Sequence, residues 1–587
     1  MGEALNGLKR TMMCGEPREI NVGEKITLMG WVQRNRKLGG LQFIDLRDRT
    51  GIMQIVFGEE INAESFEKAK AVRPEYCIAV TGEVVLREAP NTAMETGMVE
   101  LKCESIKVLS ESETPPIYIK EGLDAAENIR LKYRYLDLRR PDMQKIFMIR
   151  NRATKAVRDY LDNNGFLEVE TPILNKSTPE GARDYLVPSR NYPGMFYALP
   201  QSPQIFKQLL MVSGFNKYFQ IAPCFRDEDP RSDRLYGEFY QLDFEMSFAT
   251  EEDVYKVGQK VFYDIFTKFG NKEVSPIPFR RIPYQEAILK YGSDKPDLRN
   301  PLEITDVTNI LSESDFAPFK KTTIRAIKVS SVDKSNSWYK QMEEYVKTLG
   351  GVLGYIKVNE DLTFKSSLDK FFTDKIRENL KSNLSLESGN VVFIIANENV
   401  AKCAKMMGQL RIKLGQELDL IDKSKYIFCI VNDFPFYELD EEDNSIAFSH
   451  NPFSMPQGGL DALNNQEPLS IKAYQYDFVC NGYEMASGGV RNHDRRILKK
   501  AFEIAGYDEE VVKAKFPSLY EAFRYGAPPH AGMAPGIDRI LMLLKDEENI
   551  REMVAFPLSA NGSDAMMGCP GEVFEKQLRE THIKIRD

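Results

Sequence analysis

A charged and aromatic stretch, FRDEDPRSDRLYGEFYQLDFEM, runs from Phe225 to Met246. It contains three arginines, four aspartates, three glutamates and five aromatic residues. Its first arginine, Arg226, ends the apolar run YFQIAPCFR, which has the character of a strand. An arginine side chain presents a planar fork of N–H donors that suits carboxylates and phosphates. We therefore expect Arg226 to meet an acidic partner, either in the protein or in a ligand.

A second feature with chemical potential is a pair of acids, Asp477 and Glu484, seven residues apart in YDFVCNGYE. Carboxylate oxygens are ligands that Mg²⁺ prefers, and phosphates share the shell of that ion. In an uninterrupted strand an odd spacing places two side chains on opposite faces. We expect a bulge at Asn481 and Gly482 to return them to one face. The alternative is an exposed pair of acids without a ligand.

The elements that position these residues begin with residues 20–110, where short alternating runs predict five strands. A helical piece, INAESFEKAKAV, separates the third strand from the fourth. This order is typical of an OB-type Greek-key barrel. Such barrels often bind single-stranded nucleic acid. The polar path SESETPPIYIK, with Pro115 and Pro116, predicts a linker after the barrel.

Beyond the linker, an amphipathic helix is predicted from Met143 to Gly165. The strand FLEVETPIL follows and contains Pro172, which favours an edge or an interface because proline cannot donate to a central ladder. Residues 297–420 have the character of a separate unit. Residues 425–545 return to strand-rich sequence and end in GMAPGIDRILMLL.

The composition fits a globular chain of 587 residues with three or four domains. The N-terminal residues lack an apolar signal core and no run is long enough to span a membrane, so we expect a cytoplasmic protein without a membrane partner. Eight scattered cysteines without a CxxC pair predict reduced thiols. The net charge is −9, but two segments, 31–50 and 130–158, are basic. They favour a polyanionic partner over a merely solvated helix face.

Seven motifs in order carry a family resemblance. FLEVETPIL, FRDEDPRSDRLYGEFYQLD and GMAPGIDRILMLL resemble the three motifs of class II aminoacyl-tRNA synthetases. Together with TPEGARDYLVP, LPQSPQIFKQLLM, HNPF and NGYEMASGGVR, they resemble the bacterial-type aspartyl members, in subclass IIb. The resemblance covers essentially the whole chain. It implies an enzyme that activates L-aspartate with ATP and Mg²⁺ and then transfers it to the 3′-terminal ribose of tRNA(Asp).

The fold that the resemblance implies is α+β and multidomain, with an antiparallel catalytic sheet. Neither GxGxxG after a strand nor GxxxxGK[ST] occurs, so side chains must hold the phosphates. We expect a C2 homodimer through the motif that contains Pro172. The expected parts are an OB-fold anticodon-binding domain (1–114), a linker or hinge (115–142), the catalytic domain in two parts (143–296 and 421–560), an inserted GAD-type α+β domain (297–420) and a C-terminal extension (561–587).

The resemblance also implies roles for particular residues. The expected catalytic residues are Arg226, Arg539 and Lys207. The expected aspartate-binding residues are Glu180, Ser202, Gln204, Lys207, Arg226, His450 and Arg491. The expected ATP-binding residues are Arg226, Asp227, Glu228, Phe239, Glu484, Gly536, Ile537, Asp538 and Arg539, and the expected metal ligands are Asp477 and Glu484. The expected anticodon-binding residues are Arg34, Arg36, Phe43, Gln54 and Glu100.

Two of these residues carry the inference on specificity. Lys207 and Arg491 would pair with the side-chain carboxylate of the substrate, so that asparagine would leave a cation underpaired. A site built for such pairing rejects the wrong ligand by ~10⁴ or more. For three other residues an ordinary role is the alternative: Glu180 as a loop acid, His450 as a structural residue and Phe43 as part of the barrel core.

The sequence departs from the family pattern in one loop, SDRLYGEF, where Leu235 and Tyr236 replace an expected ATP-contacting glutamine. Several other functions compete with the leading one. A non-discriminating form would also charge tRNA(Asn), although Leu38 favours strict use of the aspartate tRNA on family analogy. The rivals are an asparagine- or lysine-specific relative, a tRNA-binding protein without catalysis, and an amide-forming ligase.

Overall fold

The computed structural model describes residues 2–178, 181–440 and 443–586. These residues form two compact units. The first comprises residues 1–152, 230–236 and 548–574, and the second comprises residues 153–229, 237–547 and 575–587, apart from the residues not described. Among the described residues, no helix combines the length and the apolar character needed to cross a membrane.

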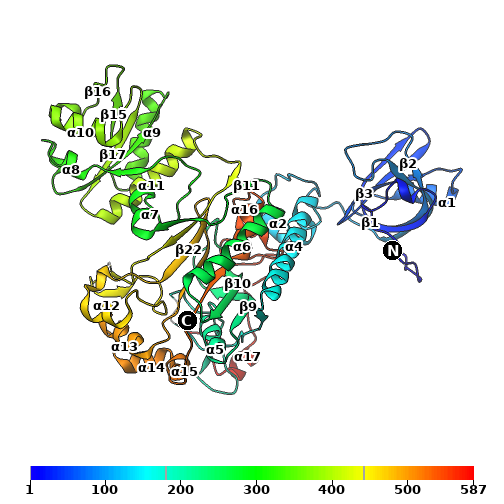
Figure 1. Ribbon diagram of the computed structural model, residues 1–587. Helices are drawn as coiled ribbons and strands as arrows, with labels where there is room; N and C mark the ends of the chain where they lie inside the picture. The colour runs from blue at the N-terminus through cyan, green and yellow to red at the C-terminus, as the bar shows by residue number, and fades with distance from the viewer. Residues whose placement is uncertain (1, 179–180, 441–442, 587) are drawn as a thin grey trace. The chain divides into compact units, whose positions relative to one another are not determined.

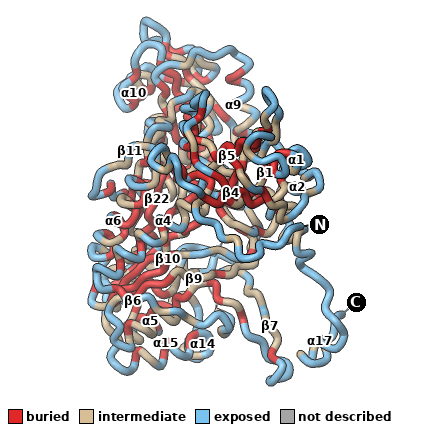
Figure 2. The backbone as a smooth tube through the Cα atoms, turned by 90° about the vertical axis from the view of Figure 1, so that its right-hand side faces the viewer, coloured by how far each residue is buried: buried red, intermediate tan, exposed pale blue. Residues whose placement is uncertain are grey.

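The first unit contains a closed five-stranded barrel, which confirms the predicted OB-type fold. The strand order is β1-β2-β3-β5-β4, and α1 (Ala63–Ala71) lies between β3 and β4 as expected. Alternate residues such as Leu28, Ile44 and Ile55 fill the interior, and Figure 2 shows buried backbone along β4 and β5. The strands are β1 (Lys25–Leu38), β2 (Leu41–Asp48), β3 (Gly51–Phe57), β4 (Cys77–Leu86) and β5 (Val99–Ser110).

The predicted linker is not wholly irregular, because it contains the short helices α2 (Glu127–Lys132) and α3 (Arg134–Asp137). The predicted helix after it, α4, spans Pro141–Asn163, and Gly165 follows with a φ of 78°. Such a left-handed residue after a helix favours glycine, which explains the stop that the sequence predicted.

The second unit is built on an eight-stranded sheet of order β12-β19-β22-β23-β24-β10-β9-β6. All neighbours pair antiparallel except β6 with β9 and β12 with β19, which confirms the predicted, mainly antiparallel sheet. The edge strand β6 is shorter than expected: it ends at Glu168, so Pro172 lies beyond the strand and not within it. The strands are β6 (Leu167–Glu168), β9 (Lys217–Arg226), β10 (Gly237–Ser247), β12 (Arg280–Pro283), β19 (Phe428–Asn432), β22 (Gln475–Cys480), β23 (Tyr483–Val490) and β24 (His530–Pro535).

Helices lie next to this sheet (Figure 1). The rings of Tyr255 and Phe262 on α6 contact Tyr476 and Phe478 on β22. Aromatic contacts of this kind anchor a helix over a strand. The main helices of this part are α5 (Gln204–Val212), α6 (Glu251–Phe269), α7 (Tyr284–Tyr291), α12 (Gly459–Asn465), α13 (Arg495–Ile504), α14 (Glu509–Lys515), α15 (Pro517–Ala522) and α16 (Ile537–Leu544).

The inserted segment carries its own five-stranded sheet, of order β13-β14-β17-β15-β16. Two separate apolar clusters cover it, one with α9 and α11 and the other with α8 and α10. Both clusters draw all their members from residues 302–420. The elements are β13 (Ile304–Asp306), α8 (Thr308–Leu311), β14 (Thr323–Val329), α9 (Asn336–Thr348), β15 (Leu353–Val358), β16 (Phe364–Lys365), α10 (Asp374–Leu384), β17 (Val391–Asn397) and α11 (Val400–Glu417).

Candidate active site

Four buried charges meet on one face of β10. Asp243 and Glu245 are two residues apart on this strand, so their side chains point to the same side. Lys207 of α5 places Nζ 2.6 Å from Asp243 Oδ1 and 3.4 Å from Glu245 Oε2. Arg491, which follows β23, donates from Nε and Nη2 to Glu245 at 2.9 and 3.2 Å. We call these four residues the charge tetrad.

The charge tetrad corrects one expectation from the sequence. Lys207 and Arg491 come together as predicted, but both already have carboxylate partners, and none of the four residues is more than 3% exposed. Burial raises the pKa of Asp243 despite its contact with Lys207. Burial alone would also raise the pKa of Glu245, but Arg491 and Lys207 hold it below its ordinary value. Any substrate carboxylate must therefore share cations that the protein has already paired.

Asp243 and Glu245 are the residues that the sequence argument missed. The available signal was the pair of acids at alternate positions in the apolar strand LDFEM. Two acids on one face of a buried strand need partners. Glycine is also required nearby, because a Cβ on Gly532 would lie 2.2 Å from Glu245 Oε2.

Four buried polar atoms in or beside the charge tetrad lack a hydrogen-bond partner among the described residues. Two are Asp243 Oδ2 and Gln208 Nε2, the latter next to Lys207 on α5. The others are Gln204 Nε2, on the first turn of α5, and Ser454 Oγ, in a residue that forms a β-bridge with Arg491. Buried polar atoms in proteins are normally satisfied. A ligand with acceptor oxygens suits this site. Gln204 was predicted, Ser454 was not, and Ser202 Oγ accepts from the backbone N–H of Gln204 at 3.2 Å.

Arg226 and Phe239 lie side by side, as a nucleotide site requires. Their strands pair with Arg226 opposite Gly237, which puts Arg226 and Phe239 on the same face. The guanidinium carbon is 5.1 Å from the centre of the Phe239 ring, and Arg226 Nε donates to the carbonyl of Gln201 at 3.3 Å. Both residues are half-buried, so Phe239 is not a core residue. Asp227 pairs with Arg183, with Nε 3.4 Å from Oδ2, and Glu228 is half-buried beside it.

The last motif approaches the same region through Gly536, Asp538 and Arg539. Gly536 bridges to Gln241 of β10 and precedes α16, which begins at Ile537. Arg539 Nη1 donates to the carbonyl of Glu484 at 2.6 Å. Asp538 is buried and accepts the Tyr240 backbone N–H at 3.4 Å. This hydrogen bond connects Arg539, an expected ATP-binding residue, with Glu484, an expected metal ligand.

The expected metal ligands, Asp477 and Glu484, converge as predicted, but not by the predicted route. Asn481 and Gly482 have φ values of 53° and 88° and form the two-residue turn of the β22–β23 hairpin, not a bulge. The register instead shifts between Phe478 and Val479. The shift is not what brings the acids together: Glu484 pairs with Val479, which is two residues from Asp477 on β22, so the hairpin itself places both carboxylates on one side.

A third residue, Lys295, lies between the two acids. Its Nζ is 3.3 Å from Glu484 Oε2 and 3.8 Å from Asp477 Oδ2. Burial and the neighbouring Glu484 raise the pKa of Asp477. Two carboxylates that converge on one cation fit a Mg²⁺ ion whose other ligands are phosphate and water. In the described part of the chain, no group of three or more His, Cys, Asp or Glu side chains forms a metal site.

The remaining residues expected in the substrate site have mixed outcomes. His450 is exposed, and its ring contacts Phe434 edge-on at 5.1 Å. Glu180 lies outside the described residues. In the first unit, Leu235 is buried, and the Tyr236 ring packs so closely on Gly562 that a Cβ there would lie 2.6 Å from it. Tyr236 thus has a packing role within that unit.

Four of the five expected anticodon-binding residues form one network on the barrel. Arg36 Nη2 donates to Gln54 Oε1 at 2.7 Å, and Gln54 Nε2 donates to Glu100 Oε2 at 2.6 Å. The Arg36 guanidinium lies 5.8 Å from the Phe43 ring. Phe43 is half-buried and alternates with the core residue Ile44, so it faces away from the barrel interior. Arg34 is exposed on the same strand as Arg36.

The basic segment 130–158 is only partly available to a polyanion. Arg130, Arg134 and Arg140 all bind the buried Asp137. Arg130 and Arg134 also reach Glu552, at 2.5 and 3.4 Å. The polyanion interpretation therefore fails for these three arginines, whose charges hold residues 548–556 against the linker helices within the first unit.

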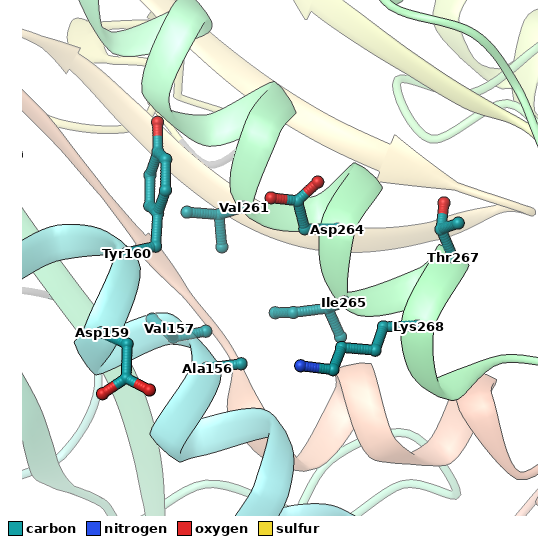
Figure 3. A pocket seen from close by; sticks show the side chains of 9 residues that line it. All are labelled: Ala156, Val157, Asp159, Tyr160, Val261, Asp264, Ile265, Thr267 and Lys268. Carbon is teal, nitrogen blue, oxygen red and sulfur yellow. The ribbon is translucent and has the colours of Figure 1, made fainter. Parts of the chain in front are cut away.

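A pocket of about 370 Å³ lies between α4 and α6 (Figure 3). Apolar side chains such as Val157 and Ile265 line it, and Asp264 and Lys268 project from α6. None of its lining residues belongs to the expected site. In the second unit, the expected site residues that lie on strands belong to β9, β10, β22 and β23.

Comparison with known proteins places these features in a family. Residues 126–560 match the family described as "tRNA synthetases class II (D, K and N)", and residues 26–109 match an "OB-fold nucleic acid binding domain". A relative from Clostridium beijerinckii, named "Aspartate--tRNA ligase", is 53% identical over 100% of this chain and 98% of its own length. A relative of the same name from Clostridium botulinum (strain Alaska E43) is 52% identical over the same shares.

Solved structures share the fold at low sequence identity. Asparaginyl-tRNA synthetase from Pyrococcus horikoshii, complexed with asparaginyl-adenylate, has a TM-score of 0.58 at 21% identity, over 94% of this chain and 98% of that one. Aspartyl tRNA synthetase from Entamoeba histolytica has a TM-score of 0.57 at 22% identity, over 94% and 92%. By the match of residues 126–560 and by full-length identity above 50%, the chain belongs to the class II tRNA synthetases of the D, K and N group.

Proposed function

We propose that this protein is an aspartate–tRNA ligase, which activates L-aspartate with ATP and transfers it to tRNA(Asp). The observation that carries the proposal is the single face of β10, which presents Phe239 at one end and Asp243 and Glu245 further along. At 3.3–3.4 Å per residue, Phe239 and Asp243 are about 13 Å apart along the strand. Adenine bound on Phe239 and aspartate bound at the charge tetrad would therefore lie next to each other along the same face of β10.

Arg226 has the central role in the first step. The α-carboxylate of aspartate attacks the α-phosphorus of ATP, a C(O)O–P bond forms, and the bond to the leaving pyrophosphate breaks. Arg226 is placed to bind the α-phosphate and the attacking carboxylate together, which keeps the attack in line and stabilises the charge on the equatorial oxygens. No general base is needed, because the carboxylate is already ionised at neutral pH. When bound, Mg²⁺ held by Asp477 and Glu484 would neutralise phosphate charge.

In the second step the terminal ribose hydroxyl of the tRNA attacks the carbonyl of the adenylate. An ester bond forms and AMP leaves, and an adenylate phosphate oxygen is a suitable acceptor for the hydroxyl proton. The barrel network of Arg36, Phe43, Gln54 and Glu100 is suited to unstacked anticodon bases, with the ring for stacking and the polar groups for base edges.

Arg226→Ala tests the assignment. We expect it to abolish aspartate-dependent ATP–pyrophosphate exchange while tRNA binding stays within a few-fold of wild type. Arg281→Ala is the matched control, because Arg281 is paired on the surface with Glu252 at 2.5 Å. Exchange at the wild-type rate in Arg226→Ala would refute the role. Charging assays with purified tRNA(Asp) and tRNA(Asn) test the non-discriminating alternative. Charging of tRNA(Asn) as well as tRNA(Asp) would support that alternative, and charging of tRNA(Asp) alone would refute it.

The proposal includes a C2 homodimer in the cytoplasm. The edge strand β6, with Pro172 just beyond it, supports this assembly, because the edge pairs with β9 on one side only within the sheet. Light scattering after size-exclusion chromatography should give twice the chain mass of 67.2 kDa. A monomer mass at micromolar protein concentration would refute the dimer.

A further inference from the structure

The geometry points to Lys295 as a built-in cation that occupies the metal position between Asp477 and Glu484 until Mg²⁺–ATP arrives. This inference rests on the proposed function, since the divalent ion belongs to the ATP reaction. The Lys295 ammonium contacts three carboxylates, with Nζ 2.5 Å from Asp294 Oδ2 and 3.3 and 3.8 Å from the two expected metal ligands. An ammonium and a metal ion cannot share that space, so the two must compete.

Lys295 reaches the site from a segment fixed at both ends on the inserted domain. At its start, Gly292 packs on Gly408 of α11 so closely that a Cβ on Gly292 would lie 2.5 Å from Gly408 Cα. Gly292 also has a φ of 66°, which favours glycine. At its end, Asn300 Nδ2 donates to the Arg411 carbonyl at 2.9 Å.

Arg411 of α11 strengthens this anchor from inside the inserted domain. It is 1% exposed and makes its hydrogen bonds to backbone carbonyls of the segment. Nη2 donates to Asp297 and Asn300 at 2.9 and 2.7 Å, and Nε donates to Leu302 at 2.5 Å. An arginine that satisfies three carbonyls of one irregular segment fixes the path of that segment. The inserted domain therefore sets where Lys295 lies.

Lys295 offsets the repulsion between the Asp477 and Glu484 carboxylates in the substrate-free site. Asp477 is 4% exposed, and two facing carboxylates repel each other when no cation is present. An internal ammonium keeps the pair together and keeps free divalent ions weakly bound. The metal is then retained only with the triphosphate, whose own charge draws the ammonium away from the pair. Lys295 is a positioning residue in this scheme.

The test measures the affinity of the substrate-free protein for Mn²⁺. Mn²⁺ is titrated into the protein and its binding is monitored by electron paramagnetic resonance. We expect Lys295→Met to bind Mn²⁺ about tenfold or more tightly than wild type, because one competing charge next to two carboxylates has gone. Lys295→Arg keeps the charge and should bind as weakly as wild type. Lys290→Met, on α7 and paired with Glu286 at the surface, is the matched control and should leave the affinity unchanged.

Equal or weaker Mn²⁺ binding by Lys295→Met, including no measurable binding by either protein, would overturn the inference. Asn300→Ala loosens the anchor and should shift the affinity in the same direction by a smaller factor; wild-type affinity in this variant would overturn the role of the inserted domain. Aspartate-dependent pyrophosphate exchange by the wild-type protein is measured in parallel. A failure of that exchange concerns the proposed function, whereas the metal titration concerns Lys295 alone.

Discussion

Variants at Lys207 and Asp243 test two proposed properties of the charge tetrad separately: its contribution to stability and its binding of aspartate. In Lys207→Met the ammonium 2.6 Å from Asp243 is lost, and two carboxylates share one arginine in a site no more than 3% exposed. Removing one partner of a buried ion pair costs about 3–5 kcal/mol. Adding Asp243→Asn removes the surplus negative charge, so the double variant should recover most of that stability.

Recognition of aspartate should not recover in the double variant. Neither variant carries the ammonium that we propose pairs with the substrate carboxylate, and truncating one partner of a buried charge pair costs about 2–5 kcal/mol of binding. At 1.36 kcal/mol per tenfold, the KM for aspartate should rise at least about 30-fold in both proteins. Denaturant unfolding measures the first effect and pyrophosphate exchange at varied aspartate measures the second.

A wild-type KM for aspartate in the double variant would refute this reasoning, because the carboxylate would then bind elsewhere. Wild-type stability in Lys207→Met would refute the first half. Lys260→Met removes an exposed lysine that pairs with Asp264 at 2.5 Å, and it should change neither quantity.

Three further outcomes follow from the contacts. Phe43→Ala should lower tRNA charging at least tenfold while pyrophosphate exchange is unchanged, since loss of base stacking costs about 1–3 kcal/mol. Burial lowers the pKa of His530 to about 4, below the 6.5 of an unfolded chain, so its contribution to stability is full above pH 6.5 and is lost as the pH falls toward 4. Between pH 7 and pH 5 the wild type should therefore lose about 2 kcal/mol more unfolding free energy than His530→Gln. Glu552→Ala should speed hydrogen exchange in residues 548–556, since Arg130 and Arg134 lose a partner.

Each of these has a matched comparison. For Phe43, Ile20→Ala at an exposed position before β1 should leave charging within twofold, and unchanged charging in Phe43→Ala would assign the ring to packing. Equal pH profiles for wild type and His530→Gln would contradict the burial argument. For Glu552, exchange as slow as in wild type would mean that the ion pairs do not hold the segment.

The sequence predicted the barrel well because its signal is local. Alternation in residues 25–48 places Leu28, Ile44 and Leu46 inside and leaves Phe43 on the other face. An edge strand was also predicted near Pro172, and β6 is at an edge, although Pro172 itself lies beyond the strand. The seven motifs also indicated charged residues that we expect in the site, such as Arg226 and Arg491.

Contacts across distant segments were not predictable from local patterns. The pairing of Lys207 with Asp243 depends on how α5 packs on β10, and the position of Lys295 depends on an inserted domain that follows it in the chain. The bulge predicted at Asn481-Gly482 is instead a two-residue hairpin turn, for which Asn-Gly is a strong signal. The basic segment 130–158 predicted a polyanionic partner, but several of its arginines form ion pairs with Asp137 and Glu552 within the protein.

The closed barrel has one more consequence. Because β1 pairs with β4 through its first half and with β2 through its second half, and β3 pairs with β5, the five strands close into a ring. The residues expected to bind the anticodon present their side chains on the outer wall of this ring. A change of one such side chain can then alter which nucleotide sequence is accepted while the framework that displays it stays intact.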